Sequence, residues 1–312
     1  MYPRLVTAAI AIVGSTLVGD SSAHRSPALP QEAAQAVFSA RSELVVLQVM
    51  VKNKSGSYVT GLPSEAFTVL EDGQQQTIQF FGLQDEPVTV GLLIDGSGSM
   101  LPVRDRVIAA VGAFAESSNQ DDEIFALTFN ENVQAVLPAN APFTGDARTL
   151  RTALSDAFVA RGRTGLHDAI EAGLEYAGKG HRQGKVLVVV SDGGDNASTA
   201  TFDEVLRLTQ ISNTVVYTIA LTDPLERDAR PKRLRKIAEA SGGEAFRPRS
   251  VAQVEDVLRH IARDIRNTYT IGYVPTNSVR DSRLRRIRVL VNTPNRRDLR
   301  VRARQGYLLE EP

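Results

Sequence analysis

The chain has 312 residues, in which 36 lysines and arginines balance 36 aspartates and glutamates. A neutral chain has no global field that would draw it to nucleic acid or to anionic lipid. Hydrophobic residues make up 42% of the sequence, which is enough for one large and one small domain, each with a core. The sequence contains no cysteine, and this excludes disulfides, thiolate metal sites and cysteine nucleophiles.

The first residues have the pattern of an export signal. Arg4 gives a positive start, residues 5–19 are apolar, and Ser21, Ser22 and Ala23 are small. This predicts a signal peptide over residues 1–23, cleaved after Ala23. The alternative is an uncleaved anchor, but the apolar run is short for a span of about 20 residues. We expect a flexible lead-in over residues 24–37.

This beginning predicts where the protein acts. We expect an exported bacterial protein, periplasmic or secreted, whose mature chain has no transmembrane segment. Nucleic acid is not expected as a partner of an exported chain.

Residues 38–86 have the composition of short β-strands separated by turns. Residues 43–51 are rich in β-branched side chains, and turn signals stand at Lys54-Ser55-Gly56 and Glu71-Asp72-Gly73. About four antiparallel strands are predicted here.

From residue 87 the pattern alternates between strands and helices. Continuous apolar runs at 88–94, 185–191 and 214–221 are typical of strands buried on both faces. Between and after them lie helix-period stretches, and Thr201 and Glu204 form a predicted capping box. Residues 87–266 are therefore predicted to be α/β, with a doubly wound, mostly parallel, Rossmann-like sheet.

After residue 266 the pattern returns to strands. The segments 269–274, 285–291 and 298–303 again have the composition of β-structure. We expect residues 38–86 and 267–308 to pair into one small β-sandwich-like domain, with the α/β domain inserted between them.

Oxygen-bearing side chains stand where the predicted strands end. Asp95, Ser97 and Ser99 follow the first buried strand, Asp192 ends the second, and Thr164 precedes a helix. In an open α/β sheet such strand ends converge on one crevice. A set of carboxylates and hydroxyls favours Mg²⁺, Ca²⁺ or Mn²⁺ over zinc or copper.

The residues around Asp95 do not match the spacing of other glycine-loop motifs or of nucleophile motifs. Leu101 stands where a dinucleotide fingerprint needs its third glycine, and no Gly-Lys-Ser/Thr follows as in a phosphate loop. Asp95 stands where a nucleophile elbow has glycine. A phosphotransfer role for Asp95 stays open, with Arg163 as the candidate cation.

Asp95-x-Ser97-x-Ser99, with Thr164 and Asp192, resembles the metal-ion-dependent adhesion site of von Willebrand factor A domains over about residues 87–266. The flanking segments GLPSEAFTVLEDG, YTIGYVP, RRIRVLV and VRARQGY resemble the bacterial exported subfamily described as "VWFA-related". The resemblance implies that Ser97, Ser99 and Thr164 contact the metal directly. It also implies that Asp95 and Asp192 bind largely through water, and that a partner's carboxylate completes the shell.

These observations predict a metal-dependent protein-binding, adhesion or scaffolding module rather than an enzyme, with Mg²⁺ as the first candidate ion. The partner would be a protein that presents an aspartate or glutamate carboxylate to the metal. Two alternatives stay open: a metal-dependent hydrolase of phosphoryl groups or esters, and a structural envelope protein with a vestigial site.

Several further residues have two interpretations. His167 is expected on a helix surface, although it could flank the metal. Asp195, Asn196 and Ser198 either brace the metal loop or form a plain turn and helix cap. The arginines of the C-terminal strands either form a basic binding stripe or a solvated strand face: Arg286, Arg288, Arg300, Arg302 and Arg304.

Overall fold

The computed structural model describes residues 44–82, 85–221, 230–279, 281, 283–293 and 298–309. The predicted signal peptide and lead-in lie outside these residues. Residues 42–312 form one compact unit. Over the described ranges, no helix combines the length and apolarity that crossing a membrane requires.

The α/β domain is built on a six-stranded sheet with the order β10-β9-β8-β5-β6-β7. All neighbouring strands in it are parallel except β6 and β7. The strands are β5 (Val88–Asp95), β6 (Glu123–Phe129), β7 (Val133–Ala135), β8 (Gly184–Ser191), β9 (Thr214–Ala220) and β10 (Ala245–Phe246). Every residue of β5 and β9 is buried, as their continuous apolar runs predict.

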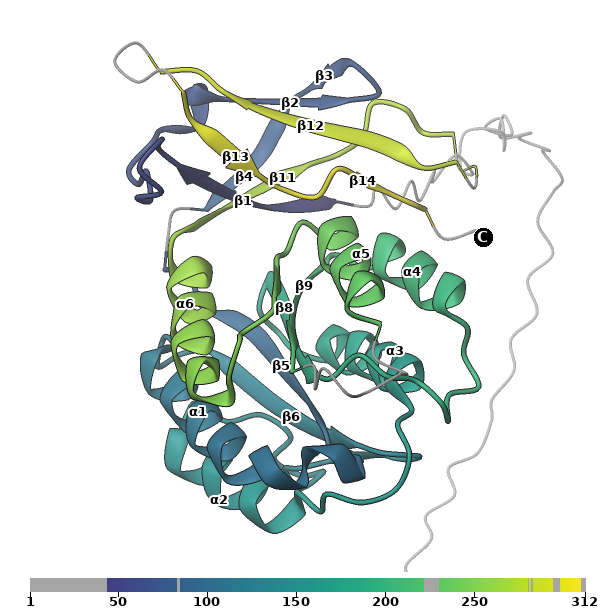
Figure 1. Ribbon diagram of the computed structural model, residues 1–312. Coiled ribbons are helices and arrows are strands. Elements are labelled where there is room, and N and C mark those ends of the chain that lie inside the picture. Colours follow the sequence, from purple (N-terminus) through teal and green to yellow (C-terminus); the bar gives the residue numbers. More distant parts are fainter. Residues whose placement is uncertain are drawn as a thin grey trace, which may run out of the picture. The chain divides into compact units, whose positions relative to one another are not determined.

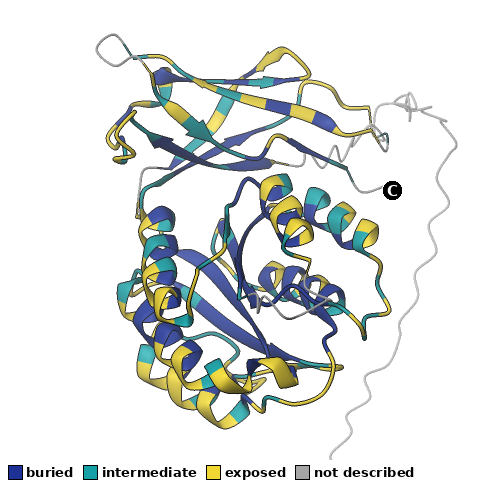
Figure 2. Cartoon of the chain, viewed as in Figure 1, coloured by how far each residue is buried: buried dark blue, intermediate teal, exposed yellow. Residues whose placement is uncertain are grey.

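Three helices cover each face of this sheet (Figure 1). One face carries α1 (Arg104–Ser117), α2 (Ala147–Ala157) and α6 (Val254–Arg266), and the other carries α3 (Leu166–Gly178), α4 (Phe202–Ile211) and α5 (Pro231–Ser241). Side chains alternate along each strand, so Leu92 and Ile94 pack against the first set and Leu93 against the second. Dark blue strands between half-exposed helices show the resulting core in Figure 2.

The helix boundaries follow local signals in most places. The predicted capping box is present, since Thr201 accepts from the Glu204 N–H while the Glu204 carboxylate accepts from the Thr201 N–H. A 3-10 helix, Gly98–Val103, which contains Pro102, precedes α1. Within this 3-10 helix, Met100 is buried and packs into the core of the α/β domain.

The two flanks of the chain pair with each other into two antiparallel sheets, with the orders β13-β1-β11-β4 and β14-β12-β2-β3. From the N-terminal flank come β1 (Val45–Lys52), β2 (Phe67–Glu71), β3 (Gln74–Gln76) and β4 (Ile78–Gly82). From the C-terminal flank come β11 (Thr268–Tyr273), β12 (Arg285–Val291), β13 (Arg300–Arg302) and β14 (Gly306–Tyr307). The predicted fold class is thus confirmed, including the small β-domain that both flanks build.

A buried ion pair lies inside the β-domain. Glu71 and Arg285 have side chains only 2% exposed, and their Oε1 and Nη1 atoms are 2.9 Å apart. The hydroxyls of Tyr273 and Tyr307 donate to Glu71 Oε2 at 2.7 and 2.9 Å. This network joins strands from both flanks, so neither flank can form this core alone.

The β-domain lies at the amino ends of the parallel strands. Five residues separate the end of β4 from the start of β5, and one residue separates the end of α6 from the start of β11. A Cβ atom placed on Gly184, where β8 begins, would lie 3.2 Å from Gln48 Nε2 of β1. The carboxyl ends of β5 and β8 are therefore at the opposite edge, about 23 Å away for an eight-residue strand.

The arginines of the last strands do not form one basic stripe. Arg286, Arg288 and Arg300 are exposed. Arg302 instead bonds to Glu244 and to Asp264 of α6, and Arg304 donates to the carbonyls of Gln210 and Ser212 at the carboxyl end of α4. Two of the five therefore fix the β-domain to the α/β domain, because β13 faces those helices.

Candidate metal centre

The loop after β5 is folded around the Asp95 carboxylate. Asp95 is fully buried, and its Oδ1 accepts the Ser97 N–H at 2.9 Å. The hydroxyls of Ser97 and Ser99 lie 3.0 Å apart. Ser97 is buried and Ser99 is exposed, so this pair runs from the interior to the surface.

The end of β8 brings Asp192 to the same loop. The Ser99 hydroxyl donates to Asp192 Oδ2 at 2.7 Å, although 93 residues separate the two in sequence. Asp192 Oδ1 accepts the Gly194 N–H at 2.8 Å, which fixes the orientation of the carboxylate. Four of the five predicted ligands are therefore linked by hydrogen bonds at the carboxyl edge of the sheet.

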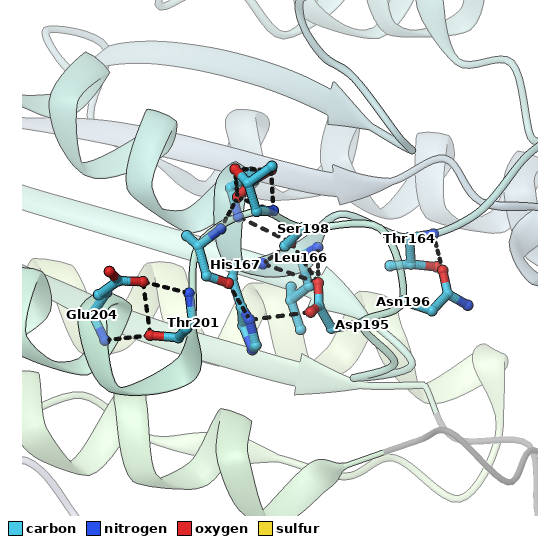
Figure 3. A network of polar contacts seen from close by, with 11 residues as sticks. Thr164, Leu166, His167, Asp195, Asn196, Ser198, Thr201 and Glu204 are labelled. Carbon is cyan, nitrogen blue, oxygen red and sulfur yellow. Dashed lines mark hydrogen bonds and ion pairs between the residues drawn. The ribbon is translucent and has the colours of Figure 1, made fainter.

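Backbone hydrogen bonds hold the loop of Thr164 at the same edge of the sheet. The neighbouring Gly162 carbonyl accepts the Gly98 N–H at 3.2 Å, which places the two loops side by side. The Thr164 N–H donates to Asn196 Oδ1 at 2.9 Å, and its carbonyl accepts the Asn196 N–H (Figure 3). Among the described residues, its side chain makes no hydrogen bond to the other four predicted ligands.

The segment after Asp192 holds the start of α3 in place. Asp195 Oδ1 accepts the Leu166 N–H at 2.9 Å and the Ser198 hydroxyl at 2.5 Å (Figure 3). The Ser198 hydroxyl in turn accepts the His167 N–H at 3.0 Å. Of the two interpretations left open by the sequence, the structure favours bracing: Asp195, Asn196 and Ser198 position the loop that carries Thr164.

The prediction for His167 is wrong. This side chain is 4% exposed, and its Nδ1 lies 3.1 Å from both Asp195 Oδ2 and the Ala200 carbonyl. The helical period alone does not reveal this burial, because the segment 195–200 that covers the histidine comes from a distant part of the chain.

Ser191 is a site residue that the sequence analysis missed. Its hydroxyl donates to Asp95 Oδ2 at 2.6 Å and accepts the Gly193 N–H at 3.0 Å. A signal for it was present: Ile94 pairs with Val190 in the parallel ladder, so the next residues, Asp95 and Ser191, come side by side.

The electrostatics of the centre favour a bound cation. The pKa of Asp95 is raised to about 6, mainly because the carboxyl group is buried and also because of the charge of Asp192, while hydrogen bonds from Ser191 and Ser97 oppose this rise. Two neighbouring carboxylates in a buried setting repel each other unless a positive charge compensates them. The donors are all hydroxyl and carboxylate oxygens, so the set fits a hard divalent cation that would supply that charge.

A sequence model described as the von Willebrand factor type A domain matches residues 90–260, more than half of the chain. The chain belongs to this family. The match covers the α/β domain and includes all five predicted ligands. No match was found among curated proteins.

Several solved structures are similar to this chain, whose α/β domain is hereafter called the von Willebrand factor type A (VWA) domain. A von Willebrand factor type A protein from Catenulispora acidiphila aligns over 88% of this chain and 76% of its own, with a TM-score of 0.50 and 14% identity. The vWF domain of the type V pili tip protein Mfa5 from Porphyromonas gingivalis aligns over 58% and 95%, with a TM-score of 0.48 and 12% identity. The PilB minor pilin from Streptococcus sanguinis aligns over 62% and 64%, with a TM-score of 0.49 and 13% identity.

A second group of potential metal ligands lies at the other edge of the VWA domain. Glu244, His260 and Asp264 have ligand atoms within 4.8 Å of one another. Arg302 already bonds to Glu244 and Asp264, and Lys52 Nζ lies 3.2 Å from Asp264. A metal ion would have to displace these cations, so this group acts as an ionic junction between the two domains.

Proposed function

We propose that the VWA domain binds a divalent cation, Mg²⁺ first, through Asp95, Ser97, Ser99, Thr164 and Asp192. The ion binds a protein partner that offers an aspartate or glutamate carboxylate. The protein then acts as an adhesion or scaffolding module of the envelope or secreted fraction. The observation that carries this proposal is the chain of hydrogen bonds from buried Asp95 through Ser97 to exposed Ser99, and from Ser99 to buried Asp192.

The position of the centre supports a binding role. The β-domain lies at the amino edge of the sheet, so it does not cover the carboxyl edge, where we propose that the partner binds. A hard cation held largely by neutral hydroxyls keeps excess positive charge, and this favours an incoming carboxylate.

We propose binding rather than catalysis because the candidate catalytic groups are engaged elsewhere. His167 Nδ1 faces Asp195 and the Ala200 carbonyl. Arg163, the candidate cation for phosphotransfer, donates to the Asn196 carbonyl and lies 3.8 Å from Glu131. Hydrolysis would need a base within reach of metal-bound water.

The metal site is tested by thermal and chemical unfolding of the chain with Mg²⁺ and with chelator. At 100 times its dissociation constant, Mg²⁺ should add about 2.7 kcal/mol to the free energy of unfolding. Asp95→Asn and Ser97→Ala should each abolish this gain while leaving the fold intact in chelator. Asp203→Ala, on the exposed first turn of α4, should retain it. An equal Mg²⁺ effect in all variants would refute the site.

The partner is tested by affinity capture from the native envelope with Mg²⁺ and again with chelator. Proteins retained only with Mg²⁺ should be lost with Asp95→Asn. They should also be lost when their own carboxyl groups are amidated. Capture that survives both changes would rule out a carboxylate on the metal. A screen of the same protein for metal-dependent hydrolase activity tests the alternative that it is an enzyme.

A further inference from the structure

A cleft of about 1330 Å³ lies between the β-domain and the carboxyl ends of α4 and α5. These two helices lie next to β14 (Figure 1). The Leu308 N–H donates to the Gln210 carbonyl at 3.0 Å, so the chain after β14 is joined to the end of α4 beside the cleft. Only two residues separate the end of α4 from the start of β9. The cleft therefore lies at the amino edge of the sheet, away from the metal centre.

The charged side chains that line this cleft are mainly basic. They comprise three acids, Asp72, Glu239 and Asp281, and six bases, Lys236, Arg283, Arg285, Arg286, Arg288 and Arg304. Two of the bases are already paired with a carboxylate. Arg283 Nε lies 2.7 Å from Asp281 Oδ2, and Arg285 pairs with buried Glu71.

The other four bases have no carboxylate partner among the described residues: Lys236, Arg286, Arg288 and Arg304. Of the remaining acids in the lining, Glu239 lies 3.6 Å from Arg235 on the same helix, and Asp72 Oδ1 accepts the backbone N–H of Arg286. Two acids thus stand against four unpaired bases, and Arg235 adds a further cation beside them. The cleft keeps an excess of positive charge, which attracts anionic groups.

Arg304 is the most buried of these four bases. It is 5% exposed, and its guanidinium donates to uncharged oxygen atoms of Gln210, Ser212, Asn213 and Gly306. The carbonyls at the carboxyl end of α4 supply only a partial negative charge. Burial lowers the pKa of Arg304 to about 10, as expected for a cation that no neighbouring carboxylate offsets. A bound anion would supply a full negative charge there.

Aliphatic side chains also line the cleft. Leu284 is 44% exposed, and Leu206, Val289 and Val301 are partly exposed. Such side chains gain free energy by burying the apolar side chains of a peptide. A glycan would instead place hydroxyl groups against them, and those hydroxyls would lose hydrogen bonds to water. The lining therefore favours an acidic peptide over an acidic polysaccharide.

We propose that the cleft binds an acidic peptide segment of a partner protein, at a site separate from the metal centre. Carboxylates of the segment pair with Arg286, Arg288 and Lys236, and one of them lies beside Arg304. An apolar side chain of the segment packs on Leu284. The chain then has two binding surfaces at opposite edges of one sheet.

The probe is a fluorescent peptide with three copies of Glu-Glu-Leu-Ser, titrated with the full chain and followed by fluorescence anisotropy. Chelator is present throughout, so that no carboxylate binds at the metal centre. Binding should saturate, and the matching Gln-Gln-Leu-Ser peptide should bind about tenfold more weakly. Arg286→Gln/Arg288→Gln removes two exposed cations and should weaken the acidic peptide by about the same factor.

Matched variants locate the effect. Arg106→Gln/Arg148→Gln removes the same charge from exposed positions of α1 and α2, and it should leave the affinity unaltered. Leu284→Ser should weaken the leucine-containing peptide but not a Glu-Glu-Ser-Ser peptide. Arg304 is kept in every variant because it joins the two domains. Circular dichroism checks that each variant is folded.

Several outcomes would overturn the inference. They are the absence of saturation below about 1 mM, and equal effects of the two double arginine variants. Tighter binding of polygalacturonate than of the peptide would assign the cleft to an acidic glycan. Peptide binding only in a chain that ends at Leu309, without Glu310 and Glu311, would assign it to the protein's own terminus. Self-association abolished by Arg286→Gln/Arg288→Gln would assign it to a second copy. None of these outcomes bears on the metal–carboxylate function, which is tested with Mg²⁺.

Discussion

Asp122 is a buried carboxylate at the amino edge of the sheet, away from the metal centre. Its Oδ1 accepts the Val88 N–H at 2.8 Å, and its Oδ2 accepts the Asn119 N–H at 3.0 Å. Burial raises its pKa to about 6, despite these two hydrogen bonds. Because this pKa is higher in the folded state than in the unfolded state, the folded state binds the proton more tightly.

The stability of the protein should therefore depend on pH through Asp122. The contribution is fully present below the unfolded pKa of about 4 and is lost as the pH rises through about 6. Between pH 4.5 and 7, the free energy of unfolding in chelator should fall by about 2 kcal/mol more in the unchanged protein than in Asp122→Asn. Urea titrations at several pH values measure this difference. Identical pH profiles would contradict the raised pKa.

At the scale of elements, the segment 195–200 acts as an external cap for α3. Asp195→Ala removes the acceptor of the Leu166 N–H and the carboxylate beside His167. We expect a lower melting temperature and a roughly tenfold loss of Mg²⁺ affinity, because the Thr164 loop loses its support. Calorimetry measures the affinity, and Glu171→Ala, an exposed change on α3, should alter neither quantity. Unchanged Mg²⁺ affinity in Asp195→Ala would show that the cap does not position a ligand.

The elements that the sequence predicted well are those with long and consistent patterns. The strands β5, β8 and β9 are continuous apolar runs because helices cover both of their faces. The two-residue strands β10 and β14 have no such signal, since their pairing is decided by neighbours distant in sequence.

For the candidate site, strand ends and motif spacing predicted which residues gather. They could not predict how each residue is held. Ser191 supports Asp95 through the register of β5 and β8, and His167 is buried by a segment some 30 residues away. Both depend on tertiary contacts that a local pattern does not contain.

At the scale of the whole unit, Arg302 joins the two domains. It bonds to Asp264, whose side chain is fully buried and also accepts the Tyr58 hydroxyl at 2.5 Å. Arg302→Met leaves the Asp264 carboxylate with less positive charge around it and should lower the free energy of unfolding by about 3 kcal/mol. Arg300→Met, at an exposed position two residues away on β13, should change it by less than about 0.5 kcal/mol. Equal effects in urea titrations would mean that the junction adds nothing to stability.

The strand β5 begins next to the β-domain and ends at the loop of the metal centre. A pull applied to a partner at the metal, and resisted through the β-domain, would run along the axis of this one strand. Its hydrogen bonds to β6 and β8 flank it on both sides over nearly its whole length. Tension would load those bonds together in shear instead of opening them one by one. Because the α/β domain is inserted between the two flanks, β5 and its hydrogen bonds would resist extension along the direction in which a bound partner would pull.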